Sequence, residues 1–196
     1  MSVWTRGACA PPWRPLALAL TSGALLPLAF APFDYWPLAI VCPAMLMQLW
    51  SGVTPRRGAL LGFCFGMGTF TAGTWWLFIS IHGFGGAPIW LSVALILVLV
   101  AVMAGYHALL GWLAVKFVPV QGAWRWYAGL PALWLLIEWW RGWFLSGFPW
   151  FSLGYTQTDT WLSAYAPVVG VYGLSALLAL QAGALAALWQ ERGRSR

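Results

Sequence analysis

Glu138 and Arg141 are the residues of this sequence whose types and spacing most suggest chemistry. They are embedded in the apolar stretch LWLLIEWWRGW. Residues three apart lie on the same face of a helix. A charge within such a stretch is costly and usually faces a partner or a polar cavity. The spacing therefore predicts either a polar site near one membrane surface or a structural ion pair that ends the helix there.

No other residues form a recognisable catalytic set. Covalent catalysis needs a nucleophile with a base within reach, and the sequence shows no Ser-His-Asp pattern, phosphate loop or pair of carboxylates. Cys9, Cys42 and Cys64 match no zinc or redox spacing. His82 is either a polar residue of the interface or part of a site, and we expect His107 to be hydrogen-bonded within a helix bundle. The residues alone predict no cofactor, no metal site and no catalytic group.

The segment 141–164 reads RGWFLSGFPWFSLGYTQTDTWLSA and combines many aromatic residues with glycines and a proline. The glycines and the proline interrupt any long helix. Trp and Tyr favour the headgroup level of a bilayer. We expect this segment to be an outer aromatic loop. It would either hold lipid headgroups or acyl chains, or only anchor the bundle.

The elements that must position these residues are membrane helices. Of the 196 residues, 62% are apolar and only 7% are charged, whereas a soluble domain carries about 25% charged residues. The net charge of +6 does not indicate nucleic-acid binding, because the basic residues are scattered between apolar runs rather than gathered on one polar face. The fold class predicted is all-α, a polytopic transmembrane helix bundle.

Residues 1–196 are predicted to form a single transmembrane domain of about six spans. The predicted spans are 15–31, 36–50, 58–82, 88–115, 127–145 and 165–190. The first two are short and contain prolines, so a re-entrant hairpin is an alternative to two full crossings. Gly58, Gly62 and Gly66 recur every four residues, which predicts a helix face that allows close approach of a second helix.

The basic residues predict the orientation. All but one fall on the same side of the six spans, and these are Arg6, Arg14, Arg56, Arg57, Lys116, Arg125, Arg192, Arg194 and Arg196. Arg141 falls on the other side. Because positive residues favour the cytoplasmic side, both termini are predicted to be cytoplasmic, and the segments 32–35, 83–87 and 141–164 to be outside.

Four stretches carry a resemblance to a known family. They are LAFAPFDYWPLA at 28–39, the glycine-rich segment 62–86, the segment 131–159 with EWWRGWFLSGFPW and GYTQ, and the run APVVGVYGLS at 166–175. In this order they resemble the membrane part of bacterial apolipoprotein N-acyltransferases. The resemblance implies a multi-pass protein of the bacterial inner membrane.

The resemblance implies an eight-span base joined to a periplasmic nitrilase-like domain. Such an enzyme takes an acyl chain from a phospholipid onto a cysteine, then passes it to the N-terminal lipidated cysteine of an apolipoprotein. The family's Glu-Lys-Cys triad belongs to the nitrilase-like domain. Cys64, Lys116 and Glu138 do not complete a triad here. We therefore expect residues 1–196 to be inactive alone.

What the resemblance carries over is a set of lipid- or substrate-binding candidates. With His82 added, they are Trp75, His82, Glu138, Arg141, Phe148, Pro149, Trp150, Gly154, Tyr155 and Gln157. The partners implied are membrane phospholipid and an apolipoprotein or a separate nitrilase-like subunit. Two alternatives remain, a non-catalytic lipid-binding or scaffold protein and, ranked below it, a small transporter.

Overall fold

The computed structural model describes residues 13–144 and 147–194, without the side chains of 194, and this part of the chain is all-helical. Arg6, Cys9 and Arg196, which entered the sequence analysis, lie outside the described residues, as does the predicted end of the fifth span at Leu145. The all-α fold class is therefore confirmed for the described residues.

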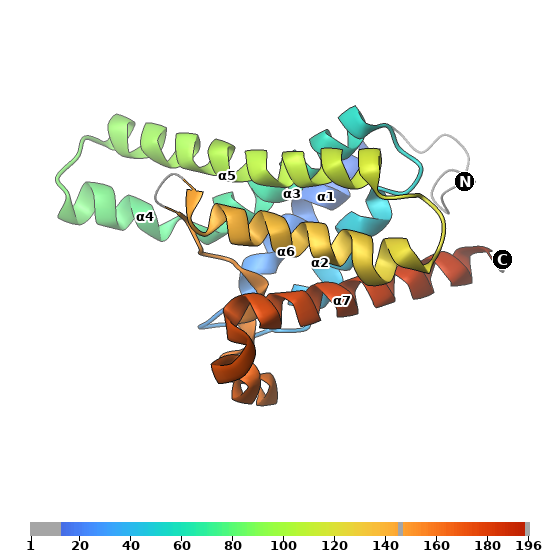
Figure 1. The fold of residues 1–196 in the computed structure, drawn as a ribbon. Coiled ribbons are helices and arrows are strands. Elements are labelled where there is room, and N and C mark those ends of the chain that lie inside the picture. Colours follow the sequence, from blue (N-terminus) through green and yellow to red (C-terminus); the bar gives the residue numbers. More distant parts are fainter. Residues whose placement is uncertain (1–12, 145–146, 195–196) are drawn as a thin grey trace.

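The helices follow one another in the order of the predicted segments (Figure 1). They are α1 (Arg14–Leu25), η2 (Leu26–Ala29), α2 (Leu38–Leu49), α3 (Pro55–Gly73), α4 (Trp76–Phe78), η3 (Ile79–Phe84), α5 (Ile89–Phe117), η4 (Arg125–Gly129), α6 (Leu130–Arg141), η6 (Leu153–Gln157), η7 (Trp161–Tyr165) and α7 (Ala166–Arg194).

Two predicted segments are interrupted where the sequence suggested continuous helices. The helix α3 ends at Thr74, whose hydroxyl donates to the Phe70 carbonyl at 2.6 Å. Such side-chain bonds compete with the helix ladder. Within α7, Gly170 has φ 66° and ψ −179°, a conformation that is essentially restricted to glycine. The first turn of α7 therefore points away from the rest of the helix (Figure 1).

Two helical stretches of the described residues are long and apolar enough to cross a membrane, Ile89–Phe117 and Trp161–Gly193. The stretches Arg14–Ala29 and Leu38–Leu49 are apolar but shorter. The number of crossings and the side of the termini stay predictions.

The glycine stripe of α3 lies against α5, which confirms the predicted close approach. A Cβ atom at Gly62 would lie 2.0 Å from the His107 carbonyl oxygen, and one at Gly66 would lie 2.6 Å from Ala104 Cα. At Gly58, a Cβ atom would lie 2.7 Å from the Gly111 carbonyl oxygen. The two backbones are therefore in direct contact along three successive turns.

The other side of the bundle is formed by α2, α6 and α7. The buried side-chain amide of Gln48 on α2 donates to the Ala186 carbonyl of α7 at 2.6 Å. A Cβ atom at Gly183 would lie 1.9 Å from the Trp126 carbonyl oxygen, so α7 also touches the backbone of η4. These contacts join α7 to α2 and to η4, and η4 leads directly into α6, the helix that carries Glu138 and Arg141.

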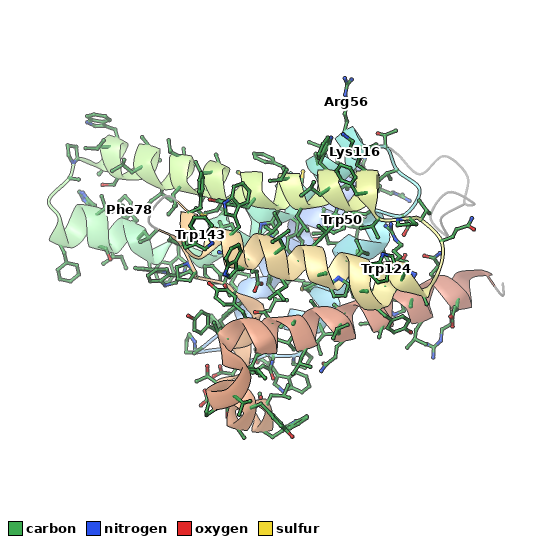
Figure 2. The ribbon with its side chains drawn as sticks, viewed as in Figure 1. Trp50, Arg56, Phe78, Lys116, Trp124 and Trp143 are labelled. Atoms are coloured by element: carbon green, nitrogen blue, oxygen red, sulfur yellow. The ribbon has the colours of Figure 1, made fainter. Side chains whose placement is uncertain are left out.

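The exposed cations Arg56 and Lys116 lie at one end of the molecule, whereas Phe78 and Trp143 lie toward the other (Figure 2). Arg125 differs from these cations because it is completely buried. Its guanidinium donates to the carbonyls of Val118 and Trp50, each at 3.3 Å. Burial lowers the pKa of Arg125 to about 10, so the group stays charged at neutral pH. It joins the loop after α5 to the end of α2.

We expect the substitution Arg125→Met to destabilise the folded chain by about 3 kcal/mol, because it leaves buried carbonyl groups without donors. The exposed Arg56 is the matched control, since Arg56→Met removes the same charge and should cost less than about 0.5 kcal/mol. Unfolding of both variants by SDS titration in one detergent measures the difference. Equal midpoints would show that Arg125 does not hold the loop.

Candidate lipid-binding site

Arg141 ends α6 and binds the loop that follows it. The side chain is 2% exposed. Its Nη1 donates to the Phe148 carbonyl at 3.0 Å and to the Trp150 carbonyl, and its Nη2 donates to Ser152 Oγ at 3.3 Å. The guanidinium carbon also lies 5.5 Å from the centre of the Phe70 ring. Arg141 thus attaches the loop to α6 and α3.

Glu138 binds the same loop one turn earlier on α6. Its Oε1 accepts hydrogen bonds from the backbone N–H of Leu153 at 3.0 Å and from Trp134 Nε1 at 2.9 Å. Both residues therefore bind the loop directly, and Glu138 also binds Trp134 within α6. The opposite charges of Glu138 and Arg141 also attract each other, so the interpretation of these two residues as a structural ion pair stays a prediction.

The segment 148–153, here called the clasped loop, is held in an unusual conformation. Phe151 has φ 63°, in the left-handed region that a bulky residue rarely adopts. Beyond the clasped loop, the Gly154 N–H donates to Ser175 Oγ on α7 at 2.8 Å. A Cβ atom at Gly154 would lie 2.1 Å from the Val171 carbonyl oxygen. The loop is therefore attached to α6 on one side and to α7 on the other.

The clasped loop forms one wall of a cavity of about 650 Å³. A second wall is the turn after α1, and a third is the end of α3. The lining residues are Pro27, Phe30, Ala31, Pro32, Phe33, Ala72, Gly73, Trp75, Trp76, Pro149, Trp150, Phe151 and Tyr155. None of them carries a charge, and most are aromatic residues or prolines. Three segments that are far apart in the sequence thus create one apolar cavity.

The structure brings four of the predicted site residues into this cavity, namely Trp75, Pro149, Trp150 and Tyr155. Others lie near it in different roles. Phe148 stacks on Trp150 at 5.1 Å and lines a second cavity, of about 320 Å³, between the loop and α5.

Two predicted residues lie apart from the main cavity. Gln157 lines a small cavity of about 190 Å³ beside η7. His82 lies in the helical hairpin between α4 and α5, where Nδ1 is 2.7 Å from the Ala87 carbonyl oxygen. His82 is therefore not brought together with the other candidates. The second histidine, His107, is buried between α3 and α6, as expected, with Nδ1 3.5 Å from the Met103 carbonyl oxygen.

Sequence reasoning missed several residues of the cavity. Phe30 and Phe33 belong to the stretch LAFAPFDYWPLA, and Phe151 belongs to the segment 131–159. The resemblance covered both stretches and is the signal that could have found them. Gly73 lies in the segment 62–86, which the resemblance also covers, but its contact with the ring of Phe151 is seen only in the folded chain.

Comparison with known proteins agrees with the geometry. A sequence model of the family described as "Apolipoprotein N-acyltransferase N-terminal domain" matches residues 22–184, a range that includes all three walls of the cavity. An apolipoprotein N-acyltransferase of Methylococcus capsulatus is 44% identical over 183 residues, which are 92% of this chain and 36% of the relative. One of Vibrio parahaemolyticus is 44% identical over 90% of this chain and 35% of its own length.

A more distant relative, the apolipoprotein N-acyltransferase of Pseudomonas putida, is 41% identical over 94% of this chain and 37% of its own length. The chain thus spans about a third of the length of these curated relatives. The family model matches most of this chain, and this match shows that the chain belongs to the apolipoprotein N-acyltransferase family, through that family's N-terminal domain.

Proposed function

We propose that the chain is the membrane part of an apolipoprotein N-acyltransferase and that its cavity of about 650 Å³ holds an acyl chain of a membrane phospholipid. The observation that carries the proposal is the uncharged, largely aromatic lining of this cavity. Cavities of about 300–1,000 Å³ with apolar walls are typical of small-molecule sites. Family membership supplies the lipid substrate class.

The topology that we propose places the cavity at the outer leaflet. About six helical segments cross the bilayer, and the end with Arg56 and Lys116 faces the cytoplasm because positive residues favour that side. At a rise of about 1.5 Å per residue, the 29 residues of α5 span about 43 Å, more than the hydrocarbon core of about 30 Å. The 12 residues of α2 span about 18 Å, which suits a short re-entrant segment or a locally thin bilayer.

The lining favours an acyl chain over a phospholipid headgroup. The clasped loop is bound by one cationic side chain, Arg141, and by one anionic side chain, Glu138. Their hydrogen bonds to the loop already occupy the charged groups that a headgroup would need. Trp75 is 65% exposed and Tyr155 is 48% exposed, and amphipathic rings of this kind are suited to the headgroup level. We infer that these two rings mark the entrance, and that the apolar interior takes the hydrocarbon.

The acyl transfer itself is proposed to need residues beyond those that line this cavity. Cys42 is buried on α2 and Cys64 lies on α3, and neither lines the cavity. A thiol that accepts an acyl group must reach the donor. We therefore propose that residues 1–196 bind the donor lipid and do not transfer its acyl chain alone. Transfer of labelled acyl groups to a diacylated lipopeptide by the purified chain would contradict this.

We expect the substitution Ala72→Phe to block lipid binding, because Ala72 lines the cavity and a phenyl ring would occupy its volume. The purified chain in nanodiscs is incubated with phosphatidylethanolamine that carries a photoreactive acyl chain. Labelled peptides are then identified by mass spectrometry. The wild-type chain should be labelled in the segments 27–33, 72–76 and 149–155. The variant should lose at least about nine tenths of this label, which corresponds to a loss of about 1.4 kcal/mol in binding free energy.

The matched control is Ala94→Phe, which adds the same ring at an exposed position of α5 outside the cavity. It should leave the label in the three segments unchanged. Uniform labelling of all lipid-facing helices in the wild-type chain would contradict the proposal. It would favour instead a scaffold role in which the aromatic loop only anchors the bundle.

A further inference from the structure

We propose that Phe151 limits the length of the acyl chain that the cavity accepts, an inference that rests on the proposed function. The ring of Phe151 lines the cavity from the clasped loop. It also contacts the wall that faces it. A Cβ atom at Gly73 would lie 2.4 Å from Phe151 Cζ, so the ring lies directly against the backbone of α3 at this glycine.

The ring is enclosed by other aromatic rings. Its centre is 5.1 Å from that of Phe30, with an interplanar angle of 85°, and 5.9 Å from that of Phe70, with an angle of 79°. Phe30 also lines the cavity, but Phe70 does not and is completely buried. Phe151 therefore stands between the cavity and the core of the bundle.

The core behind Phe151 is closely packed. The centre of the Phe70 ring lies 5.8 Å from the centre of the His107 ring and 6.1 Å from the centre of the Phe148 ring. The Arg141 guanidinium lies over the same Phe70 ring at 5.5 Å. An acyl chain that enters from the mouth would therefore end at Phe151, because the next layer leaves no room for it.

Phe151 is held in this place from both sides along the chain. Arg141 binds the carbonyl of Trp150 and the hydroxyl of Ser152, and Glu138 binds the N–H of Leu153. These bonds maintain the left-handed φ of 63°, which directs the ring into the cavity. A fixed wall discriminates by length, because each methylene that cannot be buried weakens binding about fourfold.

The test uses photoreactive phosphatidylethanolamines with myristoyl, palmitoyl or stearoyl chains, bound to the full chain in nanodiscs. For Phe151→Ala, we expect the ratio of stearoyl to myristoyl label within the cavity segments to rise at least about tenfold over wild type, since the removed ring makes room for several methylenes. Phe151→Gly should give the same shift. It also removes the backbone strain, so it tests the proposal if the alanine variant does not fold.

The control is Phe144→Ala, which removes a ring that packs on Trp140 and Trp143 outside the cavity. Its length profile should equal that of the wild type. An unchanged profile in Phe151→Gly, with Ala72→Phe still blocking the label, would overturn the length limit and leave the proposed function standing. Absence of cavity label in the wild-type chain would overturn both.

The same photoreactive chain on a diacylated lipopeptide identifies the source of the hydrocarbon. Phospholipid and lipidated acceptor present the same acyl chemistry to the cavity. A shift in length profile with the phospholipid supports the proposal as stated. A shift confined to the lipopeptide would overturn the assignment of the cavity to the acyl donor.

Discussion

The substitution Gly62→Ala should destabilise the helix bundle by about 3 kcal/mol, although it adds a single methyl group. The added Cβ would lie 2.0 Å from the carbonyl oxygen and 2.7 Å from the carbonyl carbon of His107. Both atoms belong to the backbone of α5, so no change of rotamer can relieve the overlap. Overpacking of a well-packed interior costs about 1–3 kcal/mol, and a clash between two backbones belongs at the upper end.

Gly105→Ala is the matched control for this prediction. Gly105 lies on α5 two residues before His107, and a Cβ atom there would have no atom within 4 Å. Because alanine is the better helix former, this control should be neutral or stabilise the chain by up to about 1 kcal/mol. SDS titration followed by circular dichroism compares the variants in one detergent. Equal midpoints for Gly62→Ala and Gly105→Ala would show that α3 and α5 separate easily at this point.

Loss of the Arg141 side chain is the second change with a large expected effect. Arg141→Met would leave the partly buried carbonyls of Phe148 and Trp150 without these donors and the buried carboxylate of Glu138 without the positive charge that interacts with it. Removal of one member of a buried charged network costs about 3–5 kcal/mol. We expect the clasped loop to detach, with new protease cleavage between 148 and 153 and loss of photolabelling by lipid.

Arg141→Lys separates charge from geometry. Lysine keeps the charge but lacks the planar fork that serves two carbonyls and the Ser152 hydroxyl together. This variant should be intermediate in protease sensitivity, whereas Arg56→Met, at an exposed position, should resemble wild type. Full protection of the loop in Arg141→Met would refute its role.

The double variant Glu138→Gln with Arg141→Met tests how the two residues cooperate. In a simple ion pair, removing both charges destabilises the fold less than removing one, because the single change leaves a buried charge without its partner. Because Glu138 and Arg141 bind different atoms of the clasped loop, we expect the double variant to be no more stable than Arg141→Met alone. A clear gain in the double variant would show that the interaction of the two charges outweighs their bonds to the loop.

Much of the fold could be predicted from local pattern. Long apolar runs with few charges indicated a helical membrane protein, and the order of the helices agrees with the predicted segments. The spacing of Gly58, Gly62 and Gly66 predicted a face for close packing, which α5 occupies. Such features depend on the helical repeat, which the sequence displays directly. The family was also evident from the sequence, through the stretch EWWRGWFLSGFPW.

The candidate site depended on contacts that no local pattern contains. Helical spacing placed Glu138 and Arg141 on one face, but the atoms that they bind come from a loop whose path depends on α3 and α7. The cavity joins segments 27–33, 72–76 and 149–155. The fold class and the helical segments could be predicted because they follow from composition and periodicity, and the family was evident from the stretches that resemble it. Which side chains meet could be seen only in the folded chain, because the packing of distant helices determines which groups lie within reach of one another.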